Sequence, residues 1–393
     1  MRRAERSIDL QTYQIGNDGL GRLVLKELHD AAWRGVRVRL LADDFCTLGL
    51  DAPLLQLSAH EGVEVRLFNP FVYGRDSTNG RLWNLFTDGR RLNHRMHNRL
   101  LSVESALAIA GGRNLSGEYF MLDPHNNFFD YEFIIAGALV PELAALFDRY
   151  WNHERAVDIQ RRAEAFADDP GKTFKPPTAP DRTEAHTTLA WLEARTLQAP
   201  RLSTLISPYF LPDAATRQRM RDAAQRGTQI TIITNSIASS DEPLVAFASH
   251  RHRHEWLAAG VRLFEMRPTS DTVTPFTRTA RAGSVLRLHT KMGIFDRRLL
   301  AIGSINVDPR SHRINTELAI VINSPELAGN ISDGLRALLQ TDLVQEVKLS
   351  DEGLRWHVRR PQSEQRHEEE PSVGVWQRLR LRLIYLFVPD ELL

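Results

Sequence analysis

Two histidines, each followed two positions later by a cationic residue, could carry chemistry in this sequence. His97 precedes Arg99, and His289 precedes Lys291. Residues two apart on a strand share one face, so each histidine is expected beside its cation. The cation can bind a phosphate while the histidine acts as a nucleophile or a proton donor. The spacing therefore predicts chemistry on a phosphate ester.

Each pair is followed by an acid and then by an asparagine: Glu104 and Asn114 in the first half, Asp296 and Asn306, with Ser304 close by, in the second. The asparagine amides can donate to phosphate oxygens. Glu104 lies on the opposite strand parity from Arg99, so we expect it to fix local structure rather than contact the phosphate. Asp296 and Ser304 are expected to have supporting roles.

The two motifs belong to an internal repeat. His97 and His289 are 192 residues apart, and so are Gly35 and Gly227. Each glycine follows a helical pattern and precedes an apolar strand pattern. Two independent features at one spacing indicate that the chain is built from two similar halves.

The pattern of elements predicts the fold class. Helical stretches alternate with short strands rich in Val, Ile and Leu, which is typical of α/β layers with helices covering a central sheet. A proline-rich stretch near the middle predicts a linker. The expected parts are a first domain over residues 1–155, a linker over 156–185, a second domain over 186–345 and a C-terminal extension over 346–393.

These motifs resemble those of the phospholipase D superfamily. The second half carries the full pattern, His-x-Lys, four residues, Asp, and then Gly-Ser-x-Asn. The first half keeps His97 and Asn114 but has Arg99 and Glu104 in the Lys and Asp places. Within the superfamily the chain is most similar to bacterial cardiolipin synthases of the C type. This similarity includes the runs Arg95-Met96-His97-Asn98 and Gly303-Ser304-Ile305-Asn306-Val307-Asp308-Pro309.

The resemblance implies two similar α/β/α sandwich domains packed as a pseudo-dimer, with the active site between them. It implies that one histidine attacks phosphorus to form a phospho-histidine, while the other protonates the leaving oxygen and later deprotonates the incoming alcohol or water. His97, in the first copy, takes the nucleophile's place. The implied catalytic residues are His97, His289, Lys291, Arg99, Asn114 and Asn306. Because cations and asparagines hold the phosphate oxygens, no metal or other cofactor is expected.

Further acids and the Arg99 substitution leave alternatives open. The resemblance implies an inward-facing acid at Glu317, which either orients a catalytic histidine or lies at a strand edge. Asp130 or Glu132 could play the matching part in the first half. Arg99 keeps a positive charge and can bind phosphate oxygens bidentately, but its bulk and planarity make low activity an alternative.

Composition restricts the classes of protein. Lys and Arg total 50 against 49 Asp and Glu, and this net charge of +1 does not indicate a nucleic-acid-coating surface. Cys46 is the only cysteine, so neither an intrachain disulfide nor a cysteine metal cluster can form. We interpret the cluster His250, His252 and His254 as a charged helical face, because no carboxylate accompanies it at ligand spacing.

The termini bear on membrane contact. No apolar leader follows Met1, and no stretch reaches the roughly 20 apolar residues of a spanning helix. The first expected strand begins at Ser7, which fits either a shortened form or a start further upstream. Residues 376–388 alternate arginines with apolar residues, and predict either a membrane-surface segment or packing on the second domain. The expected location is cytoplasmic, with peripheral association with the inner membrane.

The leading functional hypothesis is a phosphatidyl transferase that makes cardiolipin or a related anionic lipid. The expected donors are phosphatidylglycerol and phosphatidylethanolamine. The alternatives are hydrolysis of a phospholipid or nucleic-acid phosphodiester, and a weakly active or non-catalytic phospholipid-binding protein. The near-neutral charge argues against nucleic acid, and no oligomer is required.

Overall fold

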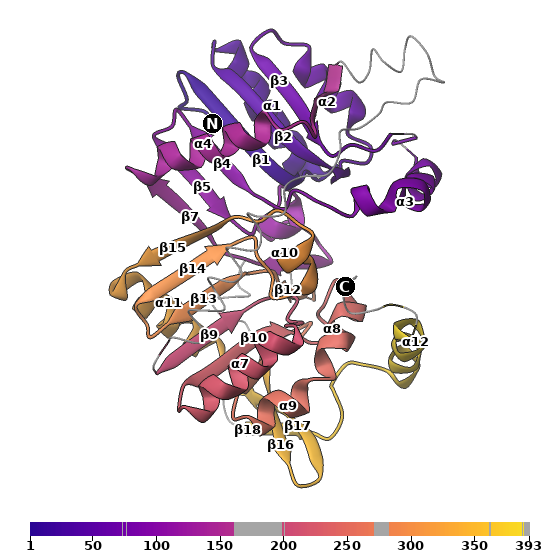
Figure 1. The fold of residues 1–393 in the computed structure, drawn as a ribbon, viewed down its shortest axis with the longest axis vertical. Helices are drawn as coiled ribbons and strands as arrows, with labels where there is room; N and C mark the ends of the chain where they lie inside the picture. The colour runs from indigo at the N-terminus through magenta and orange to yellow at the C-terminus, as the bar shows by residue number, and fades with distance from the viewer. Residues whose placement is uncertain are drawn as a thin grey trace. The chain divides into compact units, whose positions relative to one another are not determined.

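The computed structural model describes residues 1–72, 74–75, 77–160, 199, 201–270, 283–360, 363–386 and 388. These residues form two compact units. Unit 1 contains residues 1–117, 131–160 and 314–318. Unit 2 contains residues 118–130 and the described parts of 199–313 and 319–388. Figure 1 shows both units coloured along the chain.

Unit 1 is built on a mixed sheet with the strand order β7-β5-β4-β1-β2-β3-β8. β1, β2 and β3 pair in parallel, and the outer strands pair antiparallel. The strands are β1 (Ser7–Gln14), β2 (Arg37–Cys46), β3 (Val63–Phe68), β4 (Leu100–Val103), β5 (Leu107–Gly111), β7 (Glu132–Ala136) and β8 (Ala156–Asp158). The helices are α1 (Gly19–Trp33), α2 (Asp51–Ser58), α3 (Thr78–Leu92) and α4 (Leu139–Trp151).

The first β-α-β passage shows why these residues form these elements. The Asp18 side chain caps α1 by accepting from Gly21 N at 2.9 Å. The helix ends before Gly35, whose φ of +87° is a left-handed conformation that glycine adopts without steric cost. Leu28 of α1 and Val38 of β2 are fully buried in the same core cluster. Burying side chains of this size stabilises a fold by about 1.5–3 kcal/mol each.

Unit 2 has a larger sheet with the order β15-β14-β13-β9-β10-β11-β16-β17-β18. Its strands are β9 (Leu202–Ile206), β10 (Gln229–Asn235), β11 (Arg262–Met266), β13 (Met292–Phe295), β14 (Leu299–Gly303), β15 (Ala319–Asn323), β16 (Val344–Ser350), β17 (Gly353–Arg360) and β18 (Ser363–His367). Its helices are α7 (Ala214–Gln225), α8 (Pro243–His250), α9 (Arg253–Ala258), α10 (Pro309–Arg313), α11 (Pro325–Leu338) and α12 (Val375–Tyr385). A separate small sheet pairs β6 (Asn126–Phe129) with β12 (Val285–Leu288) in parallel, and the short 3-10 helix η1 (Gly117–Phe120) precedes β6.

The two large sheets repeat one topology. The order β7-β5-β4-β1-β2-β3-β8 corresponds strand for strand to β15-β14-β13-β9-β10-β11-β16. Gly227 ends α7 with φ +95°, as Gly35 ends α1. The expected α/β class with two similar sheet domains is confirmed, while the pseudo-dimeric packing stays a prediction.

Each unit also contains a short segment from the other half of the sequence. In unit 1, Thr316 forms a parallel bridge with Met96. In unit 2, β6 pairs with β12, which directly precedes His289. Each histidine-bearing segment is therefore paired with a segment that lies far away in the sequence.

The C-terminal part of the chain continues unit 2. β16, β17 and β18 extend its sheet, and α12 follows with Leu381 buried against Ile237 and Ala246. The residues 161–185 of the expected linker lie outside the described residues. Among the residues that the structure describes, no helix combines the length and apolar character needed to cross a bilayer.

Candidate active site

His97 lies in an extended segment just before β4, 8% exposed, and its backbone is held on both sides. His97 N donates to Thr316 O at 3.0 Å, and Thr316 N donates to Arg95 O at 2.9 Å. The Thr316 hydroxyl donates to the Asn98 side chain at 2.8 Å. These bonds fix the histidine's position and bring the following residue, Glu317, beside its ring.

The carboxylate of Glu317 lies 2.9 Å from His97 Nδ1, and its side chain is 1% exposed. The guanidinium of Arg99 lies against the other ring nitrogen, with Nη2 3.0 Å from Nε2. A guanidinium has no acceptor, so this contact requires Nε2 to accept and places the ring proton on Nδ1, toward Glu317. This tautomer keeps the lone pair of a nucleophile on Nε2, where Arg99 engages it.

Arg99 links the ring to Asn114. Its Nη1 donates to His97 O at 2.7 Å, and its Nε donates to the Asn114 side-chain oxygen at 2.6 Å. Asn114 Nδ2 donates to Gln14 at 3.1 Å. The first-half residues predicted for the site are therefore brought together, and both Arg99 and Asn114 are buried.

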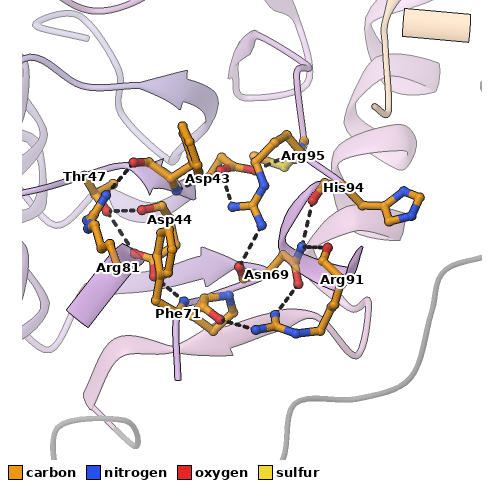
Figure 2. A network of polar contacts seen from close by, with 12 residues as sticks. Asp43, Asp44, Thr47, Asn69, Phe71, Arg81, Arg91, His94 and Arg95 are labelled. Carbon is orange, nitrogen blue, oxygen red and sulfur yellow. Dashed lines mark hydrogen bonds and ion pairs between the residues drawn. The ribbon is translucent and has the colours of Figure 1, made fainter. Parts of the chain in front are cut away.

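A buried polar network fixes the segment that leads to His97 (Figure 2). Asp43, near the end of β2, accepts from Met96 N at 2.7 Å and from Arg95 Nη1 at 3.1 Å. Asn69, just after β3, donates to His94 O at 2.7 Å and to Arg91 O at 3.0 Å. Burial raises the pKa of Asp43, and the Arg95 charge opposes this shift. Residues near the ends of the parallel strands β2 and β3 therefore hold one side of the site in place.

His289 is held in the same way in unit 2. It lies between β12 and β13, 4% exposed, and its N donates to Phe129 O at 2.8 Å. Its Nδ1 lies 2.8 Å from the carboxylate of Asp130, the residue that follows β6. Lys291 Nζ donates to His289 O at 2.7 Å. Of the two acids that the sequence left open, Asp130 contacts the histidine, whereas Glu132 pairs with Arg113 at 3.9 Å.

Asn306 and Ser304 lie in the turn between β14 and α10, and both are buried. Asn306 N donates to the Ser311 hydroxyl at 3.1 Å. The Asn306 side-chain oxygen is buried without a hydrogen-bond partner among the described residues. A buried polar atom without a partner is costly.

A strand-end residue supports each histidine at matching repeat positions. Asn235 ends β10 and bonds both backbone groups of Leu288, at 2.8 and 2.9 Å, just before His289. Asp43, at the matching position, accepts from Met96 N at 2.7 Å, just before His97. A tyrosine ring also meets each imidazole edge-on, Tyr13 at 5.0 Å from His97 and Tyr119 at 4.9 Å from His289.

Comparison with known proteins identifies this arrangement. The family model described as "Cardiolipin synthase, PLD-like domain" matches residues 1–151 and 195–339. The chain belongs to the phospholipase D superfamily. Both of its histidine motifs fall within the matched residues, as do the strands from β1 to β7 and from β9 to β15.

Individual relatives agree with this membership. Cardiolipin synthase C of Escherichia coli is 32% identical, with 99% of this chain and 92% of the relative covered. A probable cardiolipin synthase of Bacillus subtilis is 25% identical, with 90% and 64% covered. The crystal structure of phosphatidylserine synthase from Haemophilus influenzae matches with a TM-score of 0.68 at 12% identity, covering 100% of this chain and 91% of that chain. At this identity the structural match shows the fold alone.

The motif acids Glu104 and Asp296 lie in the turns of the β4–β5 and β13–β14 hairpins. Glu104 accepts from Glu5 N at 2.6 Å and Arg6 N at 3.1 Å, and these bonds lower its pKa. Asp296 accepts from Leu202 N at 2.9 Å and Arg201 N at 3.1 Å. In this phospholipase D-type chain each acid ties its hairpin to the chain that enters the central strand.

The cluster around His250 differs from the sequence interpretation, because two distant carboxylates do reach it. His250 lies 3.5 Å from Glu265 and 3.4 Å from Glu370. However, Arg253 Nη1 donates to Glu370 at 2.9 Å, and Arg253 Nε donates to Glu265 at 2.6 Å. The positive charge that a metal ion would supply is therefore already present, and the residues do not fit a cation site.

Sequence reasoning missed the supporting residues Asp43, Asn235, Tyr13 and Tyr119. Asp43 and Asn235 share the repeat spacing of the two histidines, so the repeat could have revealed them. The exchange of acids could not have been found in this way. Glu317 follows the second motif in the sequence but contacts His97 of the first motif. Asp130 follows the first motif but contacts His289 of the second.

Proposed function

We propose that the protein is a phosphatidyl transferase that acts through a phospho-histidine on His97, with His289 as the proton donor and acceptor. The observation that carries the proposal is the repeated pairing of a buried histidine with a buried carboxylate, beside a cation and an asparagine. The relatedness to cardiolipin synthases favours a phospholipid donor, phosphatidylglycerol or phosphatidylethanolamine, and an alcohol acceptor. A lipid substrate also favours peripheral membrane association.

The chemical steps follow from the ring contacts. His97 Nε2 attacks phosphorus, the bond from phosphorus to the donor's headgroup oxygen breaks, and protonated His289 supplies the proton to that oxygen. The acceptor hydroxyl then gives its proton to His289 while its oxygen displaces His97 Nε2 from phosphorus. Glu317 and Asp130 stabilise the charge on each imidazole, as a buried acid does in a catalytic triad. Arg99, Lys291 and the asparagines would hold the non-bridging oxygens.

The direct test is product analysis with the purified protein. Labelled phosphatidylglycerol in micelles should yield cardiolipin, and single-stranded DNA should remain intact. Phosphatidic acid as the sole lipid product would instead indicate a hydrolase. Nucleotide release from DNA would indicate a nuclease.

A second experiment assigns the two histidines. A phosphodiester with a nitrophenyl leaving group needs no proton donor for the first step. The His289→Ala variant should therefore release nitrophenol in a burst and retain the phosphoryl label after an alkaline quench. The His97→Ala variant should show neither burst nor label. Labelling of His97→Ala at the normal rate would exclude His97 as the nucleophile.

One observation favours a second candidate function, a phospholipid-binding protein with little turnover. Arg99 donates to the ring nitrogen that would attack phosphorus, and this contact must break before the reaction. Lipid binding without any covalent label, in the wild type and in an Arg99→Lys variant alike, would support this alternative.

A further inference from the structure

One side of α12 carries apolar side chains that unit 2 leaves exposed. At 100° per residue these side chains fall within an arc of about 100° on the helix surface. We call them the α12 stripe: Val375 (73% exposed), Trp376 (81%), Leu379 (45%), Leu383 (53%) and Leu386 (72%). An apolar stripe of this size is unusual on a helix that packs against the protein.

The opposite side of α12 holds the helix on unit 2. Leu381 is buried in a cluster with Ile237 and Ala246, and Tyr385 bonds with Arg251 and packs against Phe247. Residues just before the helix are also fixed, since Arg378 donates to Val373 O at 3.1 Å. Because this side is occupied by unit 2, the α12 stripe points away from it.

The charges beside the stripe favour an anionic partner. Arg380 and Arg382 are exposed and lie at the two edges of the stripe, one on each side. The helix contains no acidic residue. An apolar face with an interfacial tryptophan and flanking arginines is the pattern of a helix that lies in the surface of an anionic bilayer.

We propose that α12 is an interfacial helix whose stripe inserts into the headgroup region of an anionic lipid bilayer. The inference rests on the proposed function in one respect, since a phospholipid substrate brings the protein to a membrane. A second copy of the chain is the competing occupant. The flanking arginines favour lipid, because two copies meeting at this stripe would bring like charges together.

The test is sedimentation with phosphatidylcholine vesicles, with and without phosphatidic acid. Phosphatidic acid carries a phosphomonoester, so it supplies anionic charge without being a donor substrate. The α12 variant is the triple substitution Trp376→Ser/Leu379→Gln/Leu383→Gln. Trp33→Ser is the matched control, because Trp33 is 71% exposed on α1.

We expect the full-length wild type to bind the anionic vesicles and the α12 triple variant to bind at least tenfold more weakly. Replacing Arg380 and Arg382 with Gln should weaken binding to anionic vesicles about fivefold per arginine. Trp33→Ser should bind like the wild type. Unchanged vesicle binding by the α12 triple variant would overturn the proposal. A wild-type dimer that the α12 variant converts to a monomer, with vesicle binding unchanged, would assign the stripe to a second copy.

Activity toward short-chain phosphatidylglycerol below its micelle concentration separates this inference from the proposed function. The α12 triple variant should keep wild-type activity there, because no surface is needed. If the wild type bound vesicles but showed no turnover, the proposed function would be contradicted and the docking inference would still hold.

Discussion

Arg99 takes the place in the first half that Lys291 takes in the second half. Arg99 donates to the ring nitrogen of His97 and to its carbonyl, whereas Lys291 donates to the carbonyl of His289. A hydrogen bond to a charged group contributes about 1.5–3 kcal/mol. Breaking the contact with Nε2 therefore slows attack on phosphorus, unless the incoming phosphate replaces it.

We expect the Arg99→Lys variant to form the phospho-histidine about tenfold faster than the wild type, because lysine leaves Nε2 unengaged. Rapid-quench labelling with the nitrophenyl phosphodiester measures this rate. Lys291→Arg is the matched control and should not accelerate labelling. A rate for Arg99→Lys below that of the wild type would show that the guanidinium assists the reaction instead of restraining it.

The crossed acids make a second prediction. Glu317→Gln should lower the rate of labelling at His97 by about two to four orders of magnitude, because the imidazole loses the carboxylate that fixes its tautomer. Asp130→Asn should leave labelling by the nitrophenyl substrate nearly unchanged but slow lipid transfer, since its partner is His289. Equal effects of the two variants on labelling would contradict this division of roles.

The elements that carry these residues were largely predictable from the sequence. The glycines at 35 and 227 mark helix ends, and the α/β alternation indicates the layers. The expectation that His289 and Lys291 lie within a strand was wrong, because they lie in the extended segment before β13. His289 is instead placed by the bond from its backbone N to Phe129 O and by the contact of its ring with Asp130, both more than 150 residues earlier. The periodicity of the sequence holds no information on such contacts.

The C-terminal segment is a second case in which the periodicity of the sequence does not determine the structure. The arginine alternation of residues 376–388 fits either a strand or a helix. In the structure this segment forms the helix α12, which packs against α8. Glu370 anchors the segment before this helix by accepting from Ile237 N at 2.9 Å and from Arg253 at 2.9 Å. Burial alone would raise the pKa of Glu370, but His250 and Arg253 outweigh burial and hold it well below its ordinary value.

A pKa below its ordinary value predicts how this anchor depends on pH. The stabilisation is present above the ordinary value of 4.5 and is lost as the pH falls through the folded-state pKa. We expect Glu370→Gln to lower the free energy of unfolding by about 3 kcal/mol at neutral pH, and by less in acid. Urea unfolding at a series of pH values measures this difference. The neighbouring exposed Glu369→Gln should change stability little, and an equal loss for both variants would argue against the anchor.

At the scale of the whole molecule, each unit is completed by residues from the other half of the sequence. Residues 314–318 belong to unit 1, and residues 118–130 belong to unit 2. His97 and the acid that contacts it, Glu317, come from different halves of the sequence, and so do His289 and Asp130.

This division predicts the behaviour of a chain cut between residues 160 and 199. The two fragments, made together, should copurify and restore labelling of His97, since each supplies a segment that the other needs. Either fragment made alone should be inactive and less stable. Size-exclusion chromatography and the labelling assay measure both outcomes. A first fragment that is fully active by itself would show that Glu317 is dispensable.

The exchanged segments also set rules for building hybrids of this protein with its relatives. A crossover placed at the midpoint of the sequence would take His97 and its contact Glu317 from different parents, and likewise His289 and Asp130. A hybrid should tolerate the join better if residues 118–130 are taken from the parent that supplies His289, and residues 314–318 from the parent that supplies His97. The segments to exchange together in such hybrids are therefore those that form one compact unit, although they are not contiguous in the sequence. The N-terminal and C-terminal halves of the chain are not the right segments to exchange.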